Sequence, residues 1–226
     1  MNRQRQLVIV DYGVGNFRNV QKAFQAVGVE AIISDLSCDI ETAAAVVLPG
    51  VGAFGDAIAN LRHRGLEKPV LAAAQSGKPF FGICVGMQLL FEQSDEMGCH
   101  IGLGLIPGHV TRFRAGLTVP HMGWNQIEPT GDHPLLTDIQ YGDFAYFAHS
   151  YICVPGDEAH IMAKTEYGAH DDGRYFTCAV TKDNIYGIQF HPEKSQRIGL
   201  QILKNFADLV PIQKPVGWHP MPADDA

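Results

Sequence analysis

Cys84 has the sequence setting of a catalytic nucleophile. It lies in KPFFGICVGMQLLF, residues 78 to 91, with glycines two positions before it and two positions after it. The apolar run from Pro79 to Ile83 is typical of a buried strand, and the apolar spacing after Cys84 predicts a helix that extends to Phe91. A strand, a tight turn flanked by glycines and a helix form a nucleophile elbow, which pushes the nucleophile clear of the sheet. The N-terminus of the expected helix would also favour the reactive thiolate.

A thiol nucleophile needs a base, and His191 is the best candidate for it. The segment QFHPE, residues 189 to 193, follows the apolar segment IYGI. In an extended segment, residues two positions apart project to the same side, so His191 and Glu193 are expected to lie close together. His191 would take the thiol proton and Glu193 would fix its tautomer, which completes a Cys-His-acid triad with Cys84. The alternative is a strand end with solvated polar groups, and the Cys84 motif favours the triad.

The elbow also predicts an oxyanion hole. In such turns the N–H of the residue after the nucleophile, here Val85, is one donor. The segment Gly50-Val51-Gly52 ends another expected strand and could supply the second donor, because glycine lets a backbone N–H approach closely. An ordinary turn at the end of that strand is the alternative interpretation.

The other four cysteines lack a comparable setting, and we expect them to be structural. Five cysteines without regular spacing argue against a disulfide scaffold and favour a reducing, cytoplasmic location. The remaining histidines show no recurrent ligand spacing, so we expect neither a metal site nor a cofactor. The four structural cysteines are Cys38, Cys99, Cys153 and Cys178.

The first half of the chain predicts the elements that would hold these residues. Strands are expected at Leu7 to Val10, Glu30 to Ser34 and Ala44 to Leu48, in a β-α-β-β order. The helix after the first strand is expected to have Asn16 as its capping residue and Gly28 at its end. Further helices are expected at residues 54–65 and 69–74.

The second half predicts a different architecture. From Gly102 onwards, short apolar runs alternate with glycine and proline, which favours antiparallel strands over βαβ units. A last helix is expected from Ser195 to Leu209. We therefore expect one α/β domain over residues 1–210 with a mixed sheet, and an irregular, proline-rich tail over residues 211–226.

The composition is that of a soluble globular protein, with 46% hydrophobic and 18% charged residues. A net charge of −7 argues against a nucleic-acid partner or an anionic membrane surface. No stretch reaches the length of a membrane-spanning helix. Gly13-Val14-Gly15 follows the first strand, but Arg18 stands where a dinucleotide-binding fingerprint has its third glycine. A dinucleotide site is therefore not expected there.

Six motifs occur in one order from about Leu48 to Ser195: LPGVGAFGDA, KPFFGICVGMQLLFE, GLGLIPG, PHMGWN, FAHSY and IYGIQFHPEKS. Together they resemble class I (triad) glutamine amidotransferases, and more narrowly the glutaminase subunits of imidazole glycerol phosphate synthases of histidine biosynthesis. This resemblance implies a three-layer α/β fold, with a mixed and mostly parallel sheet, helices on both faces and an antiparallel C-terminal part. It also implies that Cys84 attacks the side-chain amide of glutamine, and that His191 protonates the departing ammonia.

The resemblance also implies a binding site for glutamine. Gln88, Gly52 and Glu96 match positions that hold the substrate, and Glu96 is suited to its ammonium group. The backbone amides of Ser150 and Tyr151 match those that take its carboxylate. For Glu96 the alternative is a solvated charge.

A separate (βα)8-barrel cyclase is the partner that the resemblance implies, in a heterodimer. The cyclase would use the ammonia to form imidazole glycerol phosphate and aminoimidazole carboxamide ribotide. Aromatic residues among polar ones are typical of an interface centre, although Trp124 could instead be a core residue. The residues that match family positions at or near the docking face are His121, Met122, Trp124, Asn125, Tyr146 and Lys194.

The sequence leaves three other functions open. The chain could be the glutaminase subunit of another biosynthetic synthase, such as one for anthranilate or pyridoxal phosphate, although PHMGWN argues against this. It could be a stand-alone γ-glutamyl hydrolase or thiol peptidase. A catalytically inert binding subunit is the third possibility, and the intact Cys84, His191 and Glu193 argue against it.

Overall fold

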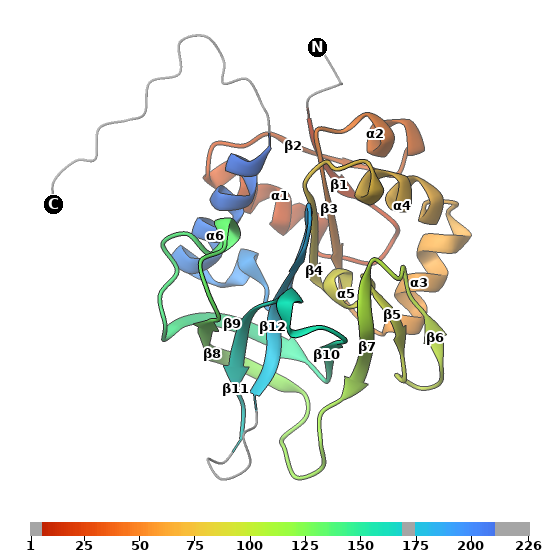
Figure 1. The fold of residues 1–226 in the computed structure, drawn as a ribbon. Coiled ribbons are helices and arrows are strands. Elements are labelled where there is room, and N and C mark those ends of the chain that lie inside the picture. The colour runs from red at the N-terminus through yellow and green to blue at the C-terminus, as the bar shows by residue number, and fades with distance from the viewer. Residues whose placement is uncertain (1–5, 169–174, 211–226) are drawn as a thin grey trace, which may run out of the picture.

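The computed structural model describes residues 6–168 and 175–210, which form strands, α-helices and short 3-10 helices (Figure 1). The strands are β1 (Leu7–Val10), β2 (Ala31–Ser34), β3 (Ala45–Gly50), β4 (Phe80–Cys84), β5 (Phe91–Ser94), β6 (His100–Ile101), β7 (Ile106–Arg112), β8 (His121–Pro129), β9 (Asp143–His149), β10 (Tyr151–Pro155), β11 (Ile161–Glu166), β12 (Tyr175–Lys182) and β13 (Ile185–Ile188). The helices are α1 (Phe17–Ala26), α2 (Ser37–Thr42), α3 (Phe54–His63), α4 (Glu67–Gln75), α5 (Val85–Gln88), α6 (Gln196–Leu209), η2 (Pro134–Leu136), η3 (Glu158–His160) and η5 (Pro192–Lys194).

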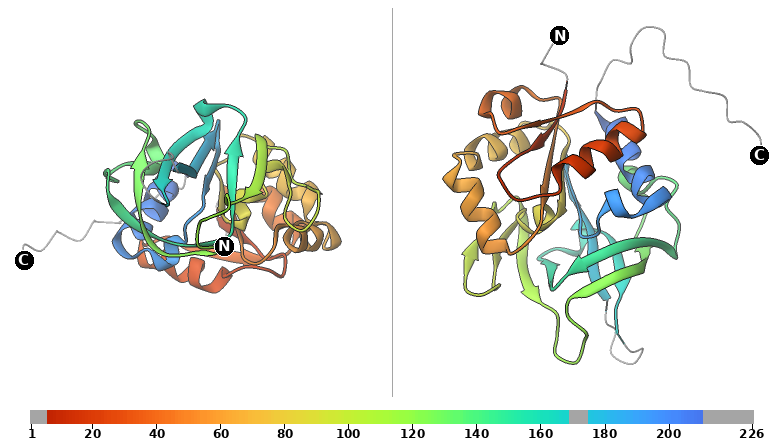
Figure 2. Two further views of the ribbon diagram at one scale, coloured as in Figure 1. Left: turned by 90° about the horizontal axis from the view of Figure 1, so that it is seen from below. Right: turned by 180° about the vertical axis from the view of Figure 1, so that it is seen from behind.

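The described strands form one mixed sheet with helices on both faces. α1 and α6 pack together on one face, as the view from behind shows, and α2 packs against α4 on the other (Figure 2). The strand order along the main path is β2-β1-β3-β4-β13-β12-β10-β7-β5-β6, and β8, β9 and β11 form an extension of it. The tail predicted for residues 211–226 lies outside the described residues, so the domain limits remain a prediction. No helix within the described ranges is long and apolar enough to span a membrane.

The parallel half of the sheet positions Cys84. β2, β1, β3, β4 and β13 run parallel, with β4 between β3 and β13. In this register Gly50 lies beside Cys84, and the segment that leads to His191 leaves β13 on the other side of β4. The carboxyl ends of parallel strands meet at one edge, which is where open α/β sheets bind ligands. The fold thus brings together residues that lie far apart in the sequence.

Aromatic packing holds α1 and α6 against the sheet. Phe81 of β4 stacks on Phe206 of α6 with ring centroids 4.8 Å apart, and Phe24 of α1 lies 6.4 Å from the same ring. All three side chains are fully buried. Burying a phenylalanine stabilises a fold by about 1.5–3 kcal/mol, so this cluster fixes the helices behind the site.

The predicted first strand, Leu7 to Val10, is confirmed residue for residue, and the antiparallel pairing predicted for the second half is confirmed as well. The β-α-β-β order is wrong, because α2 lies between β2 and β3. Its sequence SCDIET has one buried apolar residue, Ile40, and six residues are too few to show a helical period.

The helix predicted after Cys84 is shorter than expected. α5 ends at Gln88, and Phe91 already begins β5. The loop from Leu103 to Ile106 donates hydrogen bonds to the carbonyls of Leu89 and Leu90, which takes these acceptors from a continuing helix. A four-residue helix carries little macrodipole, so its effect on the Cys84 sulfur is weaker than the sequence suggested.

Candidate active site

Cys84 occupies a strained turn at the end of β4. Its backbone has φ 55° and ψ −114°, a region that non-glycine residues adopt at a cost and that is frequent at functional sites. The neighbouring glycines are required by packing. A Cβ on Gly82 would lie 2.8 Å from the backbone of Met87, and one on Gly86 would overlap the carbonyl of Leu48. The predicted elbow geometry is therefore present, with the Cys84 residue 3% exposed.

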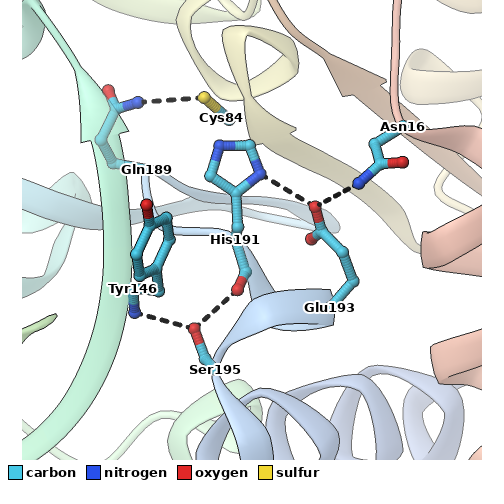
Figure 3. A network of polar contacts seen from close by, with 7 residues as sticks. All are labelled: Asn16, Cys84, Tyr146, Gln189, His191, Glu193 and Ser195. Carbon is cyan, nitrogen blue, oxygen red and sulfur yellow. Dashed lines mark hydrogen bonds and ion pairs between the residues drawn. The ribbon is translucent and has the colours of Figure 1, made fainter. Parts of the chain in front are cut away.

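His191 and Glu193 form a buried pair beside Cys84. His191 Nδ1 lies 3.0 Å from Glu193 Oε1, and only 6% and 1% of the two side chains are exposed. Figure 3 shows the opposite edge of the ring, which carries the second nitrogen, turned towards Cys84. The contact was predicted, but its geometry differs from the prediction, because Pro192–Lys194 form the 3-10 helix η5 and not an extended segment. A carboxylate only accepts, so Nδ1 donates the hydrogen bond and Nε2 is left for the Cys84 side.

Electrostatics favour the charged form of this pair. Burial alone lowers the pKa of His191, but the Cys84 sulfur and the Glu193 carboxylate outweigh it and raise that pKa to about 10. Burial raises the pKa of Glu193, and its hydrogen bonds and charge interaction with His191 reverse this, so the pKa lies below its usual value. An imidazolium next to a sulfur is a ready proton donor.

Two glutamines that meet next to Cys84 extend the site. Gln189 Nε2 donates to Cys84 Sγ at 3.7 Å, and Gln88 Nε2 donates to Gln189 Oε1 at 3.1 Å. Gln88 Nε2 also lies 3.3 Å from the carbonyl oxygen of Tyr151. Gln88 had been singled out from the sequence and Gln189 had not. The only sequence signal of Gln189 is a polar residue directly after the apolar segment IYGI, two positions before His191.

The expected oxyanion residues lie next to the elbow. Gly50 pairs with Cys84 across the parallel ladder, and a Cβ on Gly50 would meet the Tyr12 hydroxyl at 2.5 Å and Val85 Cβ at 2.9 Å. Gly52 has φ +87°, which glycine adopts without strain. The structure thus places Gly50 against Val85, with Val51 39% exposed beyond the strand end.

The other residues expected to hold glutamine lie in two different parts of the fold. Glu96 is half-buried, and its Oε2 accepts a hydrogen bond of 2.7 Å from the backbone N–H of Phe54 at the start of α3. Its carboxylate is therefore a helix-capping group and not the solvated charge of the alternative interpretation. Ser150 and Tyr151 lie at the junction of β9 and β10. The Tyr151 carbonyl is tied to Gln88, which links this junction to the elbow.

The residues expected to face a partner divide into two groups. Trp124 is 45% exposed and Met122 is 65% exposed, so the core interpretation of Trp124 is wrong. Tyr146 lies opposite Trp124 on β9, with ring centroids 6.1 Å apart, and Lys194 Nζ lies 5.4 Å from the Tyr146 ring centroid. Met122 lies two positions from Trp124 on the same side of β8. We call these four residues on β8, β9 and η5 the outer aromatic surface.

His121 and Asn125 lie beneath that surface. His121 is only 4% exposed, and its ring lies 4.0 Å from the centroid of Tyr167. His121 Nδ1 lies 3.2 Å from His149 Nε2, and His149 Nδ1 lies 2.8 Å from the carbonyl oxygen of Tyr151. Asn125 Nδ2 lies 3.3 Å from His121 Nε2. His121 therefore presents no side-chain surface to a partner in this structure, and His149 is a buried residue that the sequence reasoning did not single out.

The predicted capping role of Asn16 is wrong. Its side chain makes no hydrogen bond to its own helix. It donates instead to Glu193 Oε1 at 3.1 Å (Figure 3). Ser195 was also missed: its hydroxyl donates to the His191 carbonyl at 2.6 Å and accepts from the Tyr146 N–H at 2.9 Å. Within the described residues, no group of three or more histidine, cysteine or acidic residues is arranged to hold a metal ion.

Comparisons with known proteins identify the family of the chain. The family model described as "Glutamine amidotransferase class-I" matches residues 8–209. Proteins named "Imidazole glycerol phosphate synthase subunit HisH" from Salinibacter ruber and Syntrophotalea carbinolica are 50% and 47% identical to the chain, over 89% and 90% of it and 93% and 100% of their own lengths.

Solved structures share the fold at low identity. A glutamine amidotransferase crystal structure has a TM-score of 0.69 at 20% identity, covering 90% of this chain and 98% of its own. The structure titled "Structure of PurLQS from Thermotoga maritima" has a TM-score of 0.67 at 21% identity, covering 91% of this chain and 96% of its own. The chain belongs to the class I glutamine amidotransferase family.

Proposed function

We propose that this chain is the glutaminase subunit of an imidazole glycerol phosphate synthase in histidine biosynthesis. The single observation that carries the chemistry is the strained Cys84 turn, with the buried His191–Glu193 pair beside it. The pathway is supported by relatives of that name, which are 45–50% identical to the chain over most of both lengths. In this enzyme glutamine is hydrolysed to glutamate and ammonia, and a second subunit consumes the ammonia.

Cys84 and His191 carry out the bond changes in the proposed mechanism. The Cys84 sulfur attacks the side-chain amide carbon of glutamine, and the N–H groups of Val85 and the Gly50-Val51-Gly52 segment stabilise the oxyanion. His191 gives a proton to the departing ammonia, which leaves a glutamyl thioester. His191 then acts as the base for the water that releases glutamate. The raised pKa of His191 suits its first role, because the ring starts as a proton donor.

Glutamine is held by groups around the elbow in this proposal. The Gln88 side chain lies one turn from Cys84, between the Tyr151 carbonyl and Gln189. The backbone amides of Ser150 and Tyr151 would bind the substrate carboxylate. Gly52 and Glu96 would lie near the substrate's backbone end. Glu96 keeps one oxygen, Oε1, free of its hydrogen bond to the start of α3, and this oxygen would bind the ammonium group.

The partner is proposed to be a (βα)8-barrel cyclase that docks on the outer aromatic surface in a cytoplasmic heterodimer. Ammonia released into water would be protonated and lost, so hydrolysis is useful only next to a second catalytic centre. The cyclase would combine the ammonia with its nucleotide substrate to form imidazole glycerol phosphate and aminoimidazole carboxamide ribotide. Support comes from Trp124, Tyr146 and Lys194, since an exposed tryptophan beside a half-buried tyrosine and a cation is typical of interface centres.

Coupled hydrolysis is the experimental signature of this function. Glutamate release from glutamine is measured for the chain alone, with the cyclase, and with the cyclase plus its nucleotide ligand. We expect little turnover by the chain alone and strong stimulation in the full mixture. High and equal activity in all three mixtures would contradict the proposal and would favour a stand-alone γ-glutamyl hydrolase. Activity with the cyclase of another pathway, and none with this one, would favour another biosynthetic synthase.

A further inference from the structure

The loop between β1 and α1 reaches the far side of the proposed triad. Asn16 is the last residue of this loop, and its Nδ2 donates to Glu193 Oε1 at 3.1 Å across 177 positions of sequence (Figure 3). An asparagine at a helix start commonly accepts a hydrogen bond from the helix backbone, which stabilises the helix by about 1 kcal/mol. Asn16 makes no such bond. The side-chain amide of Asn16 therefore binds the Glu193 carboxylate and does not cap α1.

Glu193 depends on this contact for its orientation. The Glu193 side chain is 1% exposed, and its Oε1 accepts from both His191 Nδ1 and Asn16 Nδ2. Its other oxygen, Oε2, has no hydrogen-bond partner within the described residues. His191 and Glu193 belong to the same short segment, so the hydrogen bond between them does not tie that segment to another element. The hydrogen bond from Asn16 provides such a tie, because Asn16 lies at the start of α1.

Asn16 is rigid enough to provide that hold. Its carbonyl accepts the N–H groups of Asn19 and Val20 at 3.1 Å each, so its backbone belongs to the first turn of α1. That helix is fixed in turn by Val20 and Phe24, which are 1% and 0% exposed in the core. The position of the amide is thus set by packing between α1 and the rest of the molecule.

We propose that Asn16 is a positioning residue for the glutaminase reaction, which holds Glu193 so that the tautomer and direction of His191 are fixed towards Cys84. This inference rests on the proposed function, because it assigns Asn16 to that reaction. Asn16 touches neither the substrate nor the reacting atoms in this account and acts through Glu193 alone. Its loss should therefore lower kcat and leave the KM for glutamine nearly unchanged.

Two substitutions separate positioning from packing. Asn16→Ala removes the donor, and Asn16→Asp keeps the shape of the side chain but replaces the donor by an acceptor next to Glu193. Aspartate is as favourable as asparagine before a helix, so the second variant preserves the start of α1. Asn19→Ala is the matched control, because Asn19 lies exposed in the first turn of the same helix.

Each variant is assayed for glutamine hydrolysis in complex with the cyclase and its nucleotide ligand, and for unfolding temperature. We expect kcat about 10- to 100-fold lower for Asn16→Ala, lower still for Asn16→Asp, and unchanged for Asn19→Ala, with KM for glutamine within about threefold throughout. A purely structural role would instead make Asn16→Asp the better tolerated of the two variants.

Asn16→Asp with kcat within twofold of the unmodified chain would overturn the inference. This failure is distinct from failure of the proposed function. If the function were wrong, the unmodified chain would itself show no stimulation by the cyclase. If Asn16→Ala does not fold, the kcat of Asn16→Asp alone tests the positioning role.

Discussion

Two buried histidine sites in this molecule have opposite protonation. His191 lies beside Glu193 and Cys84, and these groups raise its pKa to about 10 against the effect of burial. His149 is also buried, but burial is there the largest influence and lowers its pKa to about 3. Burial also lowers the pKa of His121 to about 4. The difference teaches that burial alone keeps a histidine neutral, and that a buried histidine carries charge only where neighbouring groups outweigh the effect of burial.

Hydrogen bonds explain the neutral pair. The Tyr151 carbonyl can only accept, so His149 Nδ1 carries a proton and donates to it. His149 Nε2 must then accept from His121 Nδ1, and His121 Nε2 accepts from the Asn125 amide. Each ring has one proton and one lone pair in use. Adding a proton to either ring would place two donors against each other, which a buried site resists.

The first way to test this contrast is to remove each histidine in turn. His191→Gln should lower glutamine hydrolysis by the cyclase complex by at least about 10³-fold, because the proton donor and base is lost. His149→Gln should retain kcat within about tenfold but lower the free energy of unfolding by about 1–3 kcal/mol, since it breaks a buried hydrogen-bonded chain. Steady-state kinetics and denaturant unfolding measure the two effects. Equal losses of activity in both variants would contradict the separation of roles.

Neutralising the acid tests the cause of the charge on His191. Glu193→Gln should lower kcat by about 10²- to 10³-fold and lower the pKa of His191, because one of its two pKa-raising partners is lost while the Cys84 sulfur remains. NMR of nitrogen-labelled histidine rings measures the protonation midpoint directly. A midpoint that does not move in the variant would show that Glu193 makes no contribution to the charge on His191. The signals of His121 and His149 are internal controls and should not move.

The neutral pair predicts a loss of stability in acid. A histidine whose pKa is lowered on folding takes up its proton more readily in the unfolded chain, so the stability that it contributes above pH 6.5 is lost as the pH falls towards about 3. His149 alone should contribute about 1.4 kcal/mol per pH unit within this range. Denaturant unfolding between pH 6.5 and 4 should therefore show a shallower pH slope in a His121→Phe/His149→Phe double variant. The same slope in both proteins would contradict the assignment of a neutral pair.

The sequence predicted the residues that act through local structure. Cys84 was identified because a strand, flanking glycines and a turn lie within a few positions of it, and His191 with Glu193 because they are two positions apart. Two predicted conformations are wrong: the helix after Cys84 is shorter than predicted, and Pro192–Lys194 form a 3-10 helix where an extended segment is predicted. The contact between His191 and Glu193 is nevertheless present because the two residues are close along the chain, whereas Cys84 meets them only because β4 and β13 are neighbouring strands.

Contacts between residues that lie far apart in the sequence could not be predicted from it. Asn16 is a residue type that commonly caps helices, and nothing in the neighbouring sequence indicates a hydrogen-bond partner 177 positions away. The family resemblance predicts His121 at or near the partner surface, yet alternation along β8 turns its side chain inward. Gln189 and His149 carry no local signal beyond being polar residues, one directly after β13 and the other at the end of β9.

The most direct test of the central claim is Cys84→Ser in complex with the cyclase, with synthesis of imidazole glycerol phosphate measured from glutamine and, separately, from added ammonia. If Cys84 is the nucleophile that releases ammonia for the partner, synthesis from glutamine falls by at least about 10³-fold, while synthesis from ammonia stays within about twofold of the unmodified complex. Loss of both activities would mean that Cys84 maintains the structure of the complex. Retention of both would mean that another group attacks glutamine.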